Sequence, residues 1–349
     1  MYKGTGISKD QLSDDGEPCI LYGELYTKYK SETIREVISK TNINNTKLVR
    51  SKANDVIIPC SGETAEDIAT ARCVLNGNIL LGGDLNIIRL HGYDGAFMSY
   101  QLNGRRKYDI AKVAQGVSVV HLYGEHLKGV KTINPCLEEQ KKIAKLLSLL
   151  DERIATQNKI IDKLQSLIKG IRNDVFGKLR KSIGFNAMIS DVLCYEQPQP
   201  YIVEDTEYTA GGTPVLTANK AFVLGYTSET DGIYDKGDCI IFDDFTLDCK
   251  YVDFPFKVKS SAIKILTAKN KELLRYTFEF LKYLDLSTDE HKRHYIAETQ
   301  NQEFILPTTQ IVRTIAHAFS TLSSRMQTIV KQRDMLELQK QYLLRQMFI

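Results

Sequence analysis

The chain has 349 residues, of which 43% are hydrophobic and 26% charged, and its formal net charge is +3. This length predicts two domains or a little more, and the small net charge excludes the argument that an overall basic protein binds nucleic acid. No apolar run reaches the roughly 18 residues that a membrane span needs, and the opening MYKGTGISKDQLSDDGE lacks the apolar core of a signal peptide.

Four segments follow one another along the chain. Residues 1–133 and 182–306 show the mixed pattern of strands and short helices, and residues 134–181 and 307–349 each show a long helical pattern. The two helical segments are basic, whereas 182–306 holds 12 basic and 20 acidic side chains. The seven cysteines are scattered without a CxxC pair, which predicts free thiols in a reducing, cytoplasmic compartment.

The first helical segment has the features of a long coiled-coil helix. Pro135 suits its start, and Glu138 and Glu139 place negative charge in the first turn, where the helix dipole favours it. Apolar residues then recur in alternating steps of four and three, which is a heptad pattern. The positions of this first seam are Ile143, Leu147, Leu150, Ile154, Ile161 and Leu164.

The second helical segment repeats the first at a constant offset, without a gap. At that offset Pro135 falls on Pro307, Ile143 on Ile315 and Phe176 on Phe348. The second seam comprises Ile315, Phe319, Leu322, Met326, Ile329 and Leu336. Arg333 and Lys340 occupy seam positions as well, so we expect the apolar stripe to drift toward Met335 and Leu338.

The two globular segments also resemble each other, in the same order along the chain. PCILYGELYTKY parallels PVLTANKAFVLGYT; NDVIIPCSGETAEDIA parallels GDCIIFDDFTLDCKYV, with Ile57 and Ile58 against Ile240 and Ile241. LGGDLNIIRL parallels VKSSAIKILT. The chain is therefore predicted to be a tandem duplication of a domain followed by a helix. Two such copies, with their helices antiparallel, would form a pseudo-twofold reader of two DNA half-sites.

The stretch LEEQKKIAKLLSLLDERIATQNKIIDKLQSLIKGI resembles the helical region of type I restriction-modification specificity subunits. SGETAEDIATARCV and AQGVSVVHLYGEHLK in the first domain, and IIFDDFT, YVDFPFKVKSSAIKIL and HKRHYIAE in the second, are similar to the same family. The resemblance implies a mixed α/β fold of two target recognition domains, 1–133 and 182–306, separated by two long antiparallel helices, 134–181 and 307–349.

The same resemblance implies a non-catalytic subunit that reads double-stranded DNA at a bipartite target. Its helices would dock methyltransferase subunits, expected to be two, and a restriction subunit would join them. S-adenosylmethionine, ATP and Mg²⁺ would be bound by those partners, and we expect no cofactor or metal on this chain. One departure is that the second domain opens with the helix-like segment SIGFNAMISDVLCYEQP, whereas the first begins almost directly at the matching point with MYKGTGIS. Either the chain starts late, or the missing piece of its first domain is supplied from elsewhere or dispensable.

Two other function classes are weighed against this interpretation. Asp243, Asp244 and Asp248, with Lys250, imitate the acidic cluster of a magnesium-dependent nuclease. The structural alternative is a turn after a buried strand. The third class is a coiled-coil scaffold that never touches DNA, because a basic helix surface is usually only solvated.

The candidate DNA-binding residues carry hydroxyl, amide, basic, carboxylate or aromatic groups in loops or at strand ends. In the first domain they are Lys3, Thr5, Ser8, Ser61, Glu63, Thr64, Arg105, Arg106, Lys107 and His121. In the second they are Gln197, Tyr201, Lys220, Lys257, Lys259, His291, Lys292, Arg293 and Tyr295. Helix capping by Ser61 or Thr64 and core packing by Tyr295 are the plain alternatives.

The acidic second domain must concentrate its basic groups on one face if it holds DNA. Lys257 and Lys259 stand two residues apart, so a continuous strand would point them the same way, and Lys264 is a further candidate. His121 and His126, and His291 and His294, are too few for a zinc site without further ligands.

Overall fold

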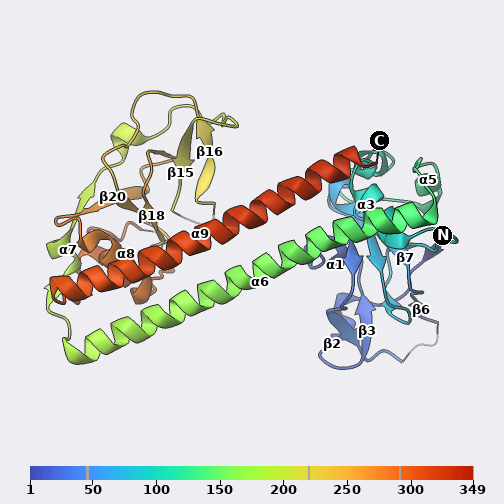
Figure 1. Ribbon diagram of the computed structural model, residues 1–349, viewed down its shortest axis with the longest axis horizontal. Helices are drawn as coiled ribbons and strands as arrows, with labels where there is room; N and C mark the ends of the chain where they lie inside the picture. The colour runs from blue at the N-terminus through green and yellow to red at the C-terminus, as the bar shows by residue number, and fades with distance from the viewer. Residues whose placement is uncertain (45–46, 219–220, 291, 349) are drawn as a thin grey trace. The chain divides into compact units, whose positions relative to one another are not determined.

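The computed structural model describes residues 1–44, 47–218, 221–290 and 292–348 (Figure 1). The chain forms two compact units: unit one is Met1–Lys159 with Val330–Ile349, and unit two is Ile160–Ile329. Each long helix contributes one half to each unit. The expected mixed α/β fold with two domains and two long helices is confirmed. No helix within the described ranges is long and apolar enough to cross a membrane.

Unit one contains two five-stranded sheets. The strands of the first, in spatial order, are β1 (Tyr2–Lys3), β11 (Leu85–Ile88), β7 (Asp55–Pro59), β9 (Arg72–Val74) and β4 (Thr33–Ile34). Those of the second are β2 (Leu12–Ser13), β5 (Ser39–Thr41), β3 (Glu17–Ile20), β10 (Leu80–Leu81) and β6 (Val49–Arg50). A short pair joins β8 (Ser61–Gly62) to β12 (Val120–His121).

The helices of unit one are mostly short. They are η1 (Lys9–Gln11), α1 (Glu24–Thr27), α2 (Ala65–Ile68), α3 (Gly95–Asn103), α4 (Lys107–Lys112) and α5 (Gly124–Lys128). Strand β7 is buried on both faces, as expected of the apolar run VIIP that follows Asp55 in the middle of a covered sheet. Helix α3 packs on β7 and β9 and presents Phe97 and Tyr100 to the long helices.

Unit two is built on the same plan. Its larger sheet has the order β14 (Leu193–Glu196), β20 (Ile263–Ala268), β17 (Cys239–Asp243) and β18 (Cys249–Val252). Its smaller sheets are β16 (Val223–Thr227), β15 (Thr213–Leu216) and β19 (Lys257–Val258), and the pair β13 (Ala187–Met188) and β21 (Glu303–Phe304). Its helices are α7 (Ile189–Val192), η2 (Gln199–Tyr201), α8 (Leu273–Leu284) and η3 (Thr299–Asn301).

The hydrogen-bond ladders establish which residues of the two domains correspond. The Cys60 N–H donates to the Asp84 carbonyl at 2.7 Å, and the Asp244 N–H donates to the Ala262 carbonyl at 2.8 Å. Counting back from these bonds, Ile57 corresponds to Ile241, so the expected match of Ile57 with Ile240 is wrong by one position. An apolar doublet cannot reveal register, because either alignment buries two isoleucines.

Helix α6 (Leu137–Ser182) and helix α9 (Thr309–Gln346) are the long elements (Figure 1). In unit one, Leu147 and Leu150 of α6 form one core cluster with Leu344 and Phe348 from the C-terminal end of the chain. Phe97 of α3 meets Phe348 edge to face, with ring centroids 5.4 Å apart. Since the first half of α6 meets the last part of α9, the helices run in opposite directions here.

Unit two repeats this packing with the other halves of the helices. Phe176 of α6 clusters with Ile315 and Phe319 of α9 and is fully buried. It meets Phe280 of α8 edge to face at 5.5 Å. Phe176 and Phe348 occupy equivalent positions of the repeated helix. Each therefore anchors a long helix on the helix that covers a domain's sheet.

The seam positions are buried or half-buried along both helices. Leu147, Leu150, Ile161, Ile315 and Phe319 are buried. The half-buried ones are Ile143, Ile154, Leu164, Leu322, Met326, Ile329 and Leu336. The expected drift of the stripe is wrong, because Met335 and Leu338 are 69% and 71% exposed.

Lys340 keeps its place in the seam because acidic groups surround it. Its ammonium lies 2.6 Å from the Asp151 carboxylate of α6 and 2.5 Å from that of Glu32. Tyr100 and Ser31 also donate hydrogen bonds to Asp151, at 2.6 and 2.8 Å. A paired and hydrogen-bonded charge can be buried where an isolated one cannot. This polar cluster ties both helices to the first domain.

Candidate nucleic-acid interface

The end of the central strand carries a matching arrangement in both domains. In unit one the Leu122 N–H donates to the Cys60 carbonyl at 2.8 Å, and in unit two the His294 N–H donates to the Asp244 carbonyl at 3.1 Å. The residues just before them, His121 and Arg293, therefore correspond, and both are exposed. We call this region, in each domain, the strand-end edge: Lys3, Ser61, Asp84 and His121 in unit one, and Gln197, Phe245, Ser261 and Arg293 in unit two.

The aspartates that imitate a nuclease site are occupied in holding this edge. One carboxylate oxygen of Asp243 accepts the N–H groups of Phe245 and Thr246, at 2.9 and 3.0 Å. One oxygen of Asp244 accepts the N–H groups of His294 and Tyr295, at 3.1 and 2.7 Å.

The other oxygen of Asp244 lies 3.5 Å from the ammonium of Lys264. Both aspartates are buried. Within the ranges the structure describes, no group of three or more His, Cys, Asp or Glu side chains is arranged to hold a metal ion. The nuclease hypothesis is therefore not favoured.

In the first domain, most candidates lie at the surface. Lys3, Thr5, Ser8, Glu63, Thr64, Arg105 and His121 are exposed, and Arg106 and Lys107 are half-buried. Ser61 is buried and pairs with His121 in the β8–β12 ladder. Thr64 accepts the Asp67 N–H at 3.1 Å and so caps α2, which is the plain alternative named for it.

Two lysines proposed to face DNA in the second domain are buried instead. Lys257 is 3% exposed, and its ammonium lies 2.6 Å from the Glu229 carboxylate and donates to the Asp231 carbonyl at 2.7 Å. Lys264 is 1% exposed. The expectation that Lys257 and Lys259 point the same way is wrong. Strand β19 ends at Val258, so the side-chain alternation of a strand does not extend to Lys259.

Two tyrosines proposed for the interface belong to the interior. Tyr295 is 1% exposed and packs edge to face on Phe242 and Tyr195, with centroids 5.4 and 5.7 Å apart. Burial raises its pKa. Tyr201 is buried and donates to Glu196 at 2.6 Å. Core packing, the alternative stated for Tyr295, is the correct interpretation of that residue.

Three of the proposed cations of the second domain are exposed: Lys259, Lys292 and Arg293. Arg293 donates to Ser261 at 3.2 Å and lies over the ring of Phe245, which holds its guanidinium in place. Lys292 lies between the carboxylates of Glu290 and Glu298, at 2.5 and 2.9 Å, and both bonds raise its pKa. Lys220 and His291 lie outside the described residues.

His294 links the strand-end edge to these charges. One ring nitrogen meets the Glu298 carboxylate at 2.9 Å and the other meets the Glu290 carbonyl at 3.3 Å. The hydrogen bond to Glu298 is the main cause that raises the pKa of His294. The segment that carries Arg293 is thus stabilised when His294 is protonated.

The sequence interpretation missed Tyr123. Its ring is 45% exposed, stacks near His121 and meets His126 edge to face, with the Lys3 ammonium 6.0 Å from its centroid. Exposed aromatic rings next to cations are typical of nucleic-acid contact surfaces. The sequence feature that could have indicated Tyr123 is its position between two histidines in HLYGEH.

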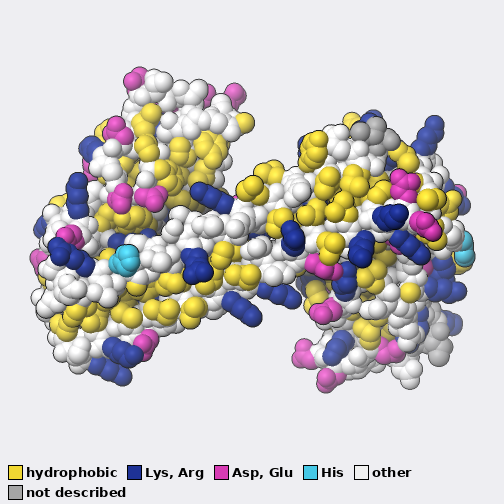
Figure 2. Space-filling model, in the orientation of Figure 1, with side chains coloured by type: hydrophobic (Ala, Val, Ile, Leu, Met, Phe, Trp, Pro, Cys, Tyr) yellow, Lys and Arg dark blue, Asp and Glu magenta, His cyan; other side chains and the backbone are white. Residues whose placement is uncertain are grey.

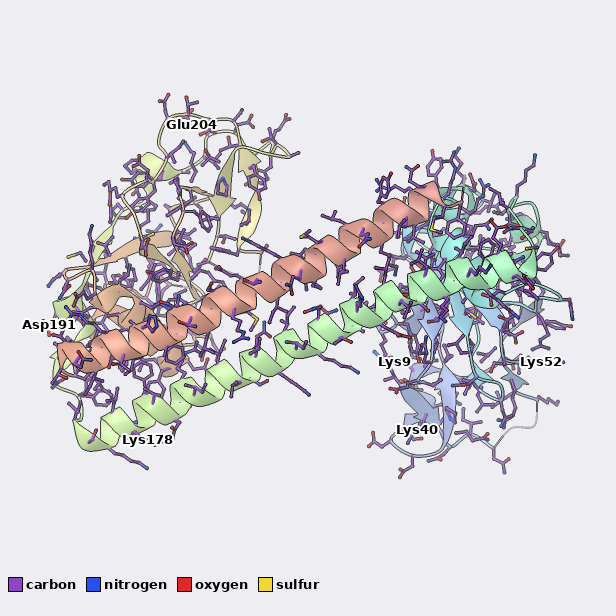
Figure 3. All side chains as sticks on the ribbon, in the orientation of Figure 1. Lys9, Lys40, Lys52, Lys178, Asp191 and Glu204 are labelled. Atoms are coloured by element: carbon purple, nitrogen blue, oxygen red, sulfur yellow. The ribbon has the colours of Figure 1, made fainter. Side chains whose placement is uncertain are left out.

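The surface away from these edges has a different character. Glu204 marks an acidic end of the second domain, and Lys178 near the end of α6 points to solvent and pairs with Asp174 at 2.7 Å (Figure 3). Lysines and arginines stand among apolar side chains on the visible face of both long helices (Figure 2).

Comparison with known proteins agrees with this architecture. Residues 3–166 match the family model described as the type I restriction modification DNA specificity domain. The chain is 44% identical over 126 residues to the type I restriction enzyme EcoR124I/EcoR124II specificity subunit of Escherichia coli, covering 34% of this chain and 31% of that one. It is 28% identical over 158 residues to the MjaVIII specificity subunit of Methanocaldococcus jannaschii, covering 45% of this chain and 35% of that one.

The fold is also found among solved structures. The type I restriction-modification system S subunit from M. genitalium superposes with a TM-score of 0.68 at 17% identity, covering 100% of this chain and 93% of that one. A two-domain protein with paired long helices and a DNA specificity domain is the class defined by these observations. Residues 3–166 thus resemble the type I restriction modification DNA specificity domain, and the fold of the whole chain resembles that of a solved S subunit. The matched regions span about a third of the length of the curated relatives.

Proposed function

We propose that this chain reads a bipartite DNA sequence for a type I restriction-modification complex and leaves catalysis to partner subunits. The observation that carries the proposal is the corresponding strand-end edge in two domains of one chain. The same scaffold presents Lys3 and His121 in one domain and Gln197 and Arg293 in the other. One scaffold with different exposed side chains suits the reading of two different half-sites.

The long helices are proposed to dock the methyltransferase subunits. In unit one, α6 and α9 border a shallow groove of about 850 Å³ lined by Leu149, Arg153, Met335 and Gln339, among others. Leu146 and Leu338, like Leu149 and Met335, are large apolar side chains that remain exposed. Exposed apolar side chains grouped with an arginine are typical of protein interfaces.

Two methyltransferase subunits and one restriction subunit are the expected partners. S-adenosylmethionine, ATP and Mg²⁺ are expected to be bound by those partners, and the cytoplasm is the expected compartment. The approximate duplication of the helices supports two similar docking surfaces, one for each methyltransferase subunit.

The test is adenine methylation mapping in cells that carry this chain together with its partner genes. The proposal expects one bipartite motif, methylated in both halves, that disappears when this chain is deleted. Methylation that persists without the chain, or retention of all DNA sequences equally by the assembled complex, would support the scaffold hypothesis instead. Cleavage of DNA by the purified chain with Mg²⁺ alone would revive the nuclease hypothesis.

A further inference from the structure

At the strand-end edge of each domain, a lysine and a side-chain amide face each other across two neighbouring strands. The two domains place them on opposite strands of the pair. In unit one Lys3 of β1 pairs with Asn86 of β11. In unit two Glu196 of β14 pairs with Ile265, so the next residue, Gln197, stands opposite Lys264. The register of β17 and β20 places Lys264 where Asn86 stands.

In each domain one member of the pair is exposed and the other is buried. Lys3 and Gln197 are exposed, whereas Asn86 and Lys264 are each 1% exposed. In the first domain the lysine is thus exposed and the amide is buried, and in the second domain the amide is exposed and the lysine is buried. A buried lysine is uncommon and requires partners for its charge.

The buried member performs the same structural task in both domains. The Asn86 amide donates to the Leu122 carbonyl at 2.9 Å, which holds the segment that presents His121. Lys264 lies 3.5 Å from Asp244, whose carboxylate accepts the N–H groups of His294 and Tyr295 and so holds the segment that presents Arg293. An amide hydrogen bond in the first domain, and an ion pair with carboxylate hydrogen bonds in the second, thus hold the corresponding segment at the end of the strand.

The lysine has a consequence for Gln197 that the asparagine does not have for Lys3. The Lys264 ammonium donates to the side-chain oxygen of Gln197 at 3.2 Å. An ammonium has only donors, so the amide must turn its oxygen inward and its NH₂ group toward the exposed side. Because Lys264 is buried and paired with Asp244, it cannot follow a rotation of the amide. Gln197 is therefore held as an oriented donor.

We propose that this cross-strand position is a specificity-determining contact to a base edge in each domain. Gln197 presents its NH₂ group to a base acceptor in the second half-site, and Lys264 is the positioning residue that orients it. Lys3 presents an ammonium at the matching point of the first half-site. The inference rests on the proposed function, because it names groups by which the two domains read different sequences.

Exposed variants test the contact without disturbing the core. Gln197→Ala removes the NH₂ group, and Gln197→Glu keeps an oxygen for Lys264 but has no donor to offer a base. Both should make one position of the second-domain half-site degenerate, with base discrimination there falling about tenfold or more. Gln199→Ala, at an exposed glutamine two residues away, is the matched control and should leave the motif unchanged.

The readout is methylation mapping by the assembled complex on a library of target sequences. An unchanged motif in both Gln197 variants would overturn the proposal, and so would an equal loss at every sequence, which indicates a phosphate contact. If the unmodified complex itself methylates no bipartite motif, the proposed function has failed rather than this inference. Lys3→Gln should alter one position in the first-domain half only, and a change in both halves would contradict it.

The positioning role of Lys264 has its own test. Lys264→Met should relax the same position that Gln197→Ala relaxes and should add nothing further in a Gln197→Ala background. Lys264→Arg keeps a donor-only cation and should restore discrimination. A Lys264→Met protein that unfolds more easily but keeps the full motif would show a purely structural role. If Lys264→Met yields no folded protein, the Gln197 variants and Lys264→Arg decide the matter.

Discussion

The ammonium of Lys340 lies 2.6 Å from the carboxylate of Asp151, across the two long helices of unit one. This contact occupies a seam position at which the heptad pattern would otherwise place an apolar side chain. Glu32 of the first domain completes the group at 2.5 Å. Burial is the main cause that raises the pKa of Glu32, whereas the two neighbouring carboxylates raise the pKa of Lys340 against the opposing effect of burial.

Lys340→Ala should lower the free energy of unfolding by roughly 3–5 kcal/mol, because it leaves two carboxylates buried without a cation. Urea unfolding of the purified chain measures this change. Lys331→Ala, at an exposed lysine on the same helix, is the control and should change the free energy by less than about 0.5 kcal/mol. A loss below about 1 kcal/mol for Lys340→Ala would mean that the cluster is open to water.

Leu150→Asp should prevent soluble folding or binding of the partner subunits, since it buries an unpaired carboxylate in the seam. Leu322→Asp should be milder, because Leu322 is only half-buried. Expression yield measures soluble folding, and co-purification with the proposed methyltransferase partners measures assembly. Normal yield and normal assembly of the Leu150→Asp chain would contradict the seam.

Lys259→Ala and Arg293→Ala should weaken DNA binding at every sequence, as expected of contacts to phosphates. Each should reduce the slope of log affinity against log salt by about 0.9. Lys259 precedes the start of β20, whereas the exposed Lys271 follows its end. Lys271→Ala is therefore the control. The measurement is titration of the assembled complex onto target and mismatched duplexes at several salt concentrations. Unchanged slopes for both variants would place the DNA contacts elsewhere.

If each domain reads one half-site, as proposed, exchanging residues 1–133 for the corresponding domain of a type I specificity subunit should change one half of the motif and leave the gap constant. Deleting one heptad from each helix, residues 155–161 and 327–333, preserves the seam and removes about 10 Å of helix. The gap should then shorten by about three base pairs, at roughly 3.4 Å each. Methylation mapping reads both changes, and an unaltered gap would rule out the helices as spacers.

The stability of the edge in the second domain should depend on pH through His294. Its pKa is raised by Glu298, so the stabilisation is fully present below the unfolded value of about 6.5 and is lost as pH rises through the folded pKa. Amide hydrogen exchange of residues 294–299 should therefore lose protection at alkaline pH beyond the intrinsic rate change. Glu298→Gln should bring the imidazole pKa, followed by NMR, back toward about 6.5. An imidazole that titrates below this value in the unmodified chain would refute the prediction.

The sequence by itself determined the architecture. The constant offset between the two helices, the heptad spacing and the proline and acidic residues at the start of the first helix are local or periodic signals. Such signals can be read directly from the sequence, because a helix that buries one face must repeat apolar residues every three or four positions. The family resemblance was recognisable for the same reason, since it lies in continuous stretches such as LEEQKKIAKLLSLLDERI.

The candidate site depended on the tertiary structure. Lys257 and Lys264 have the same residue type as Lys259, yet Glu229 and Asp244 make it possible to bury the first two. Those acidic partners lie on other segments of the chain, so no spacing rule identifies them. The polarity of Lys340 suggested that the apolar stripe would turn away from it. Lys340 stays in the seam because Glu32, from a distant part of the sequence, pairs with it there. Charge compensation acts through space, so only the folded chain decides which cations are buried with a partner and which stay exposed at the surface.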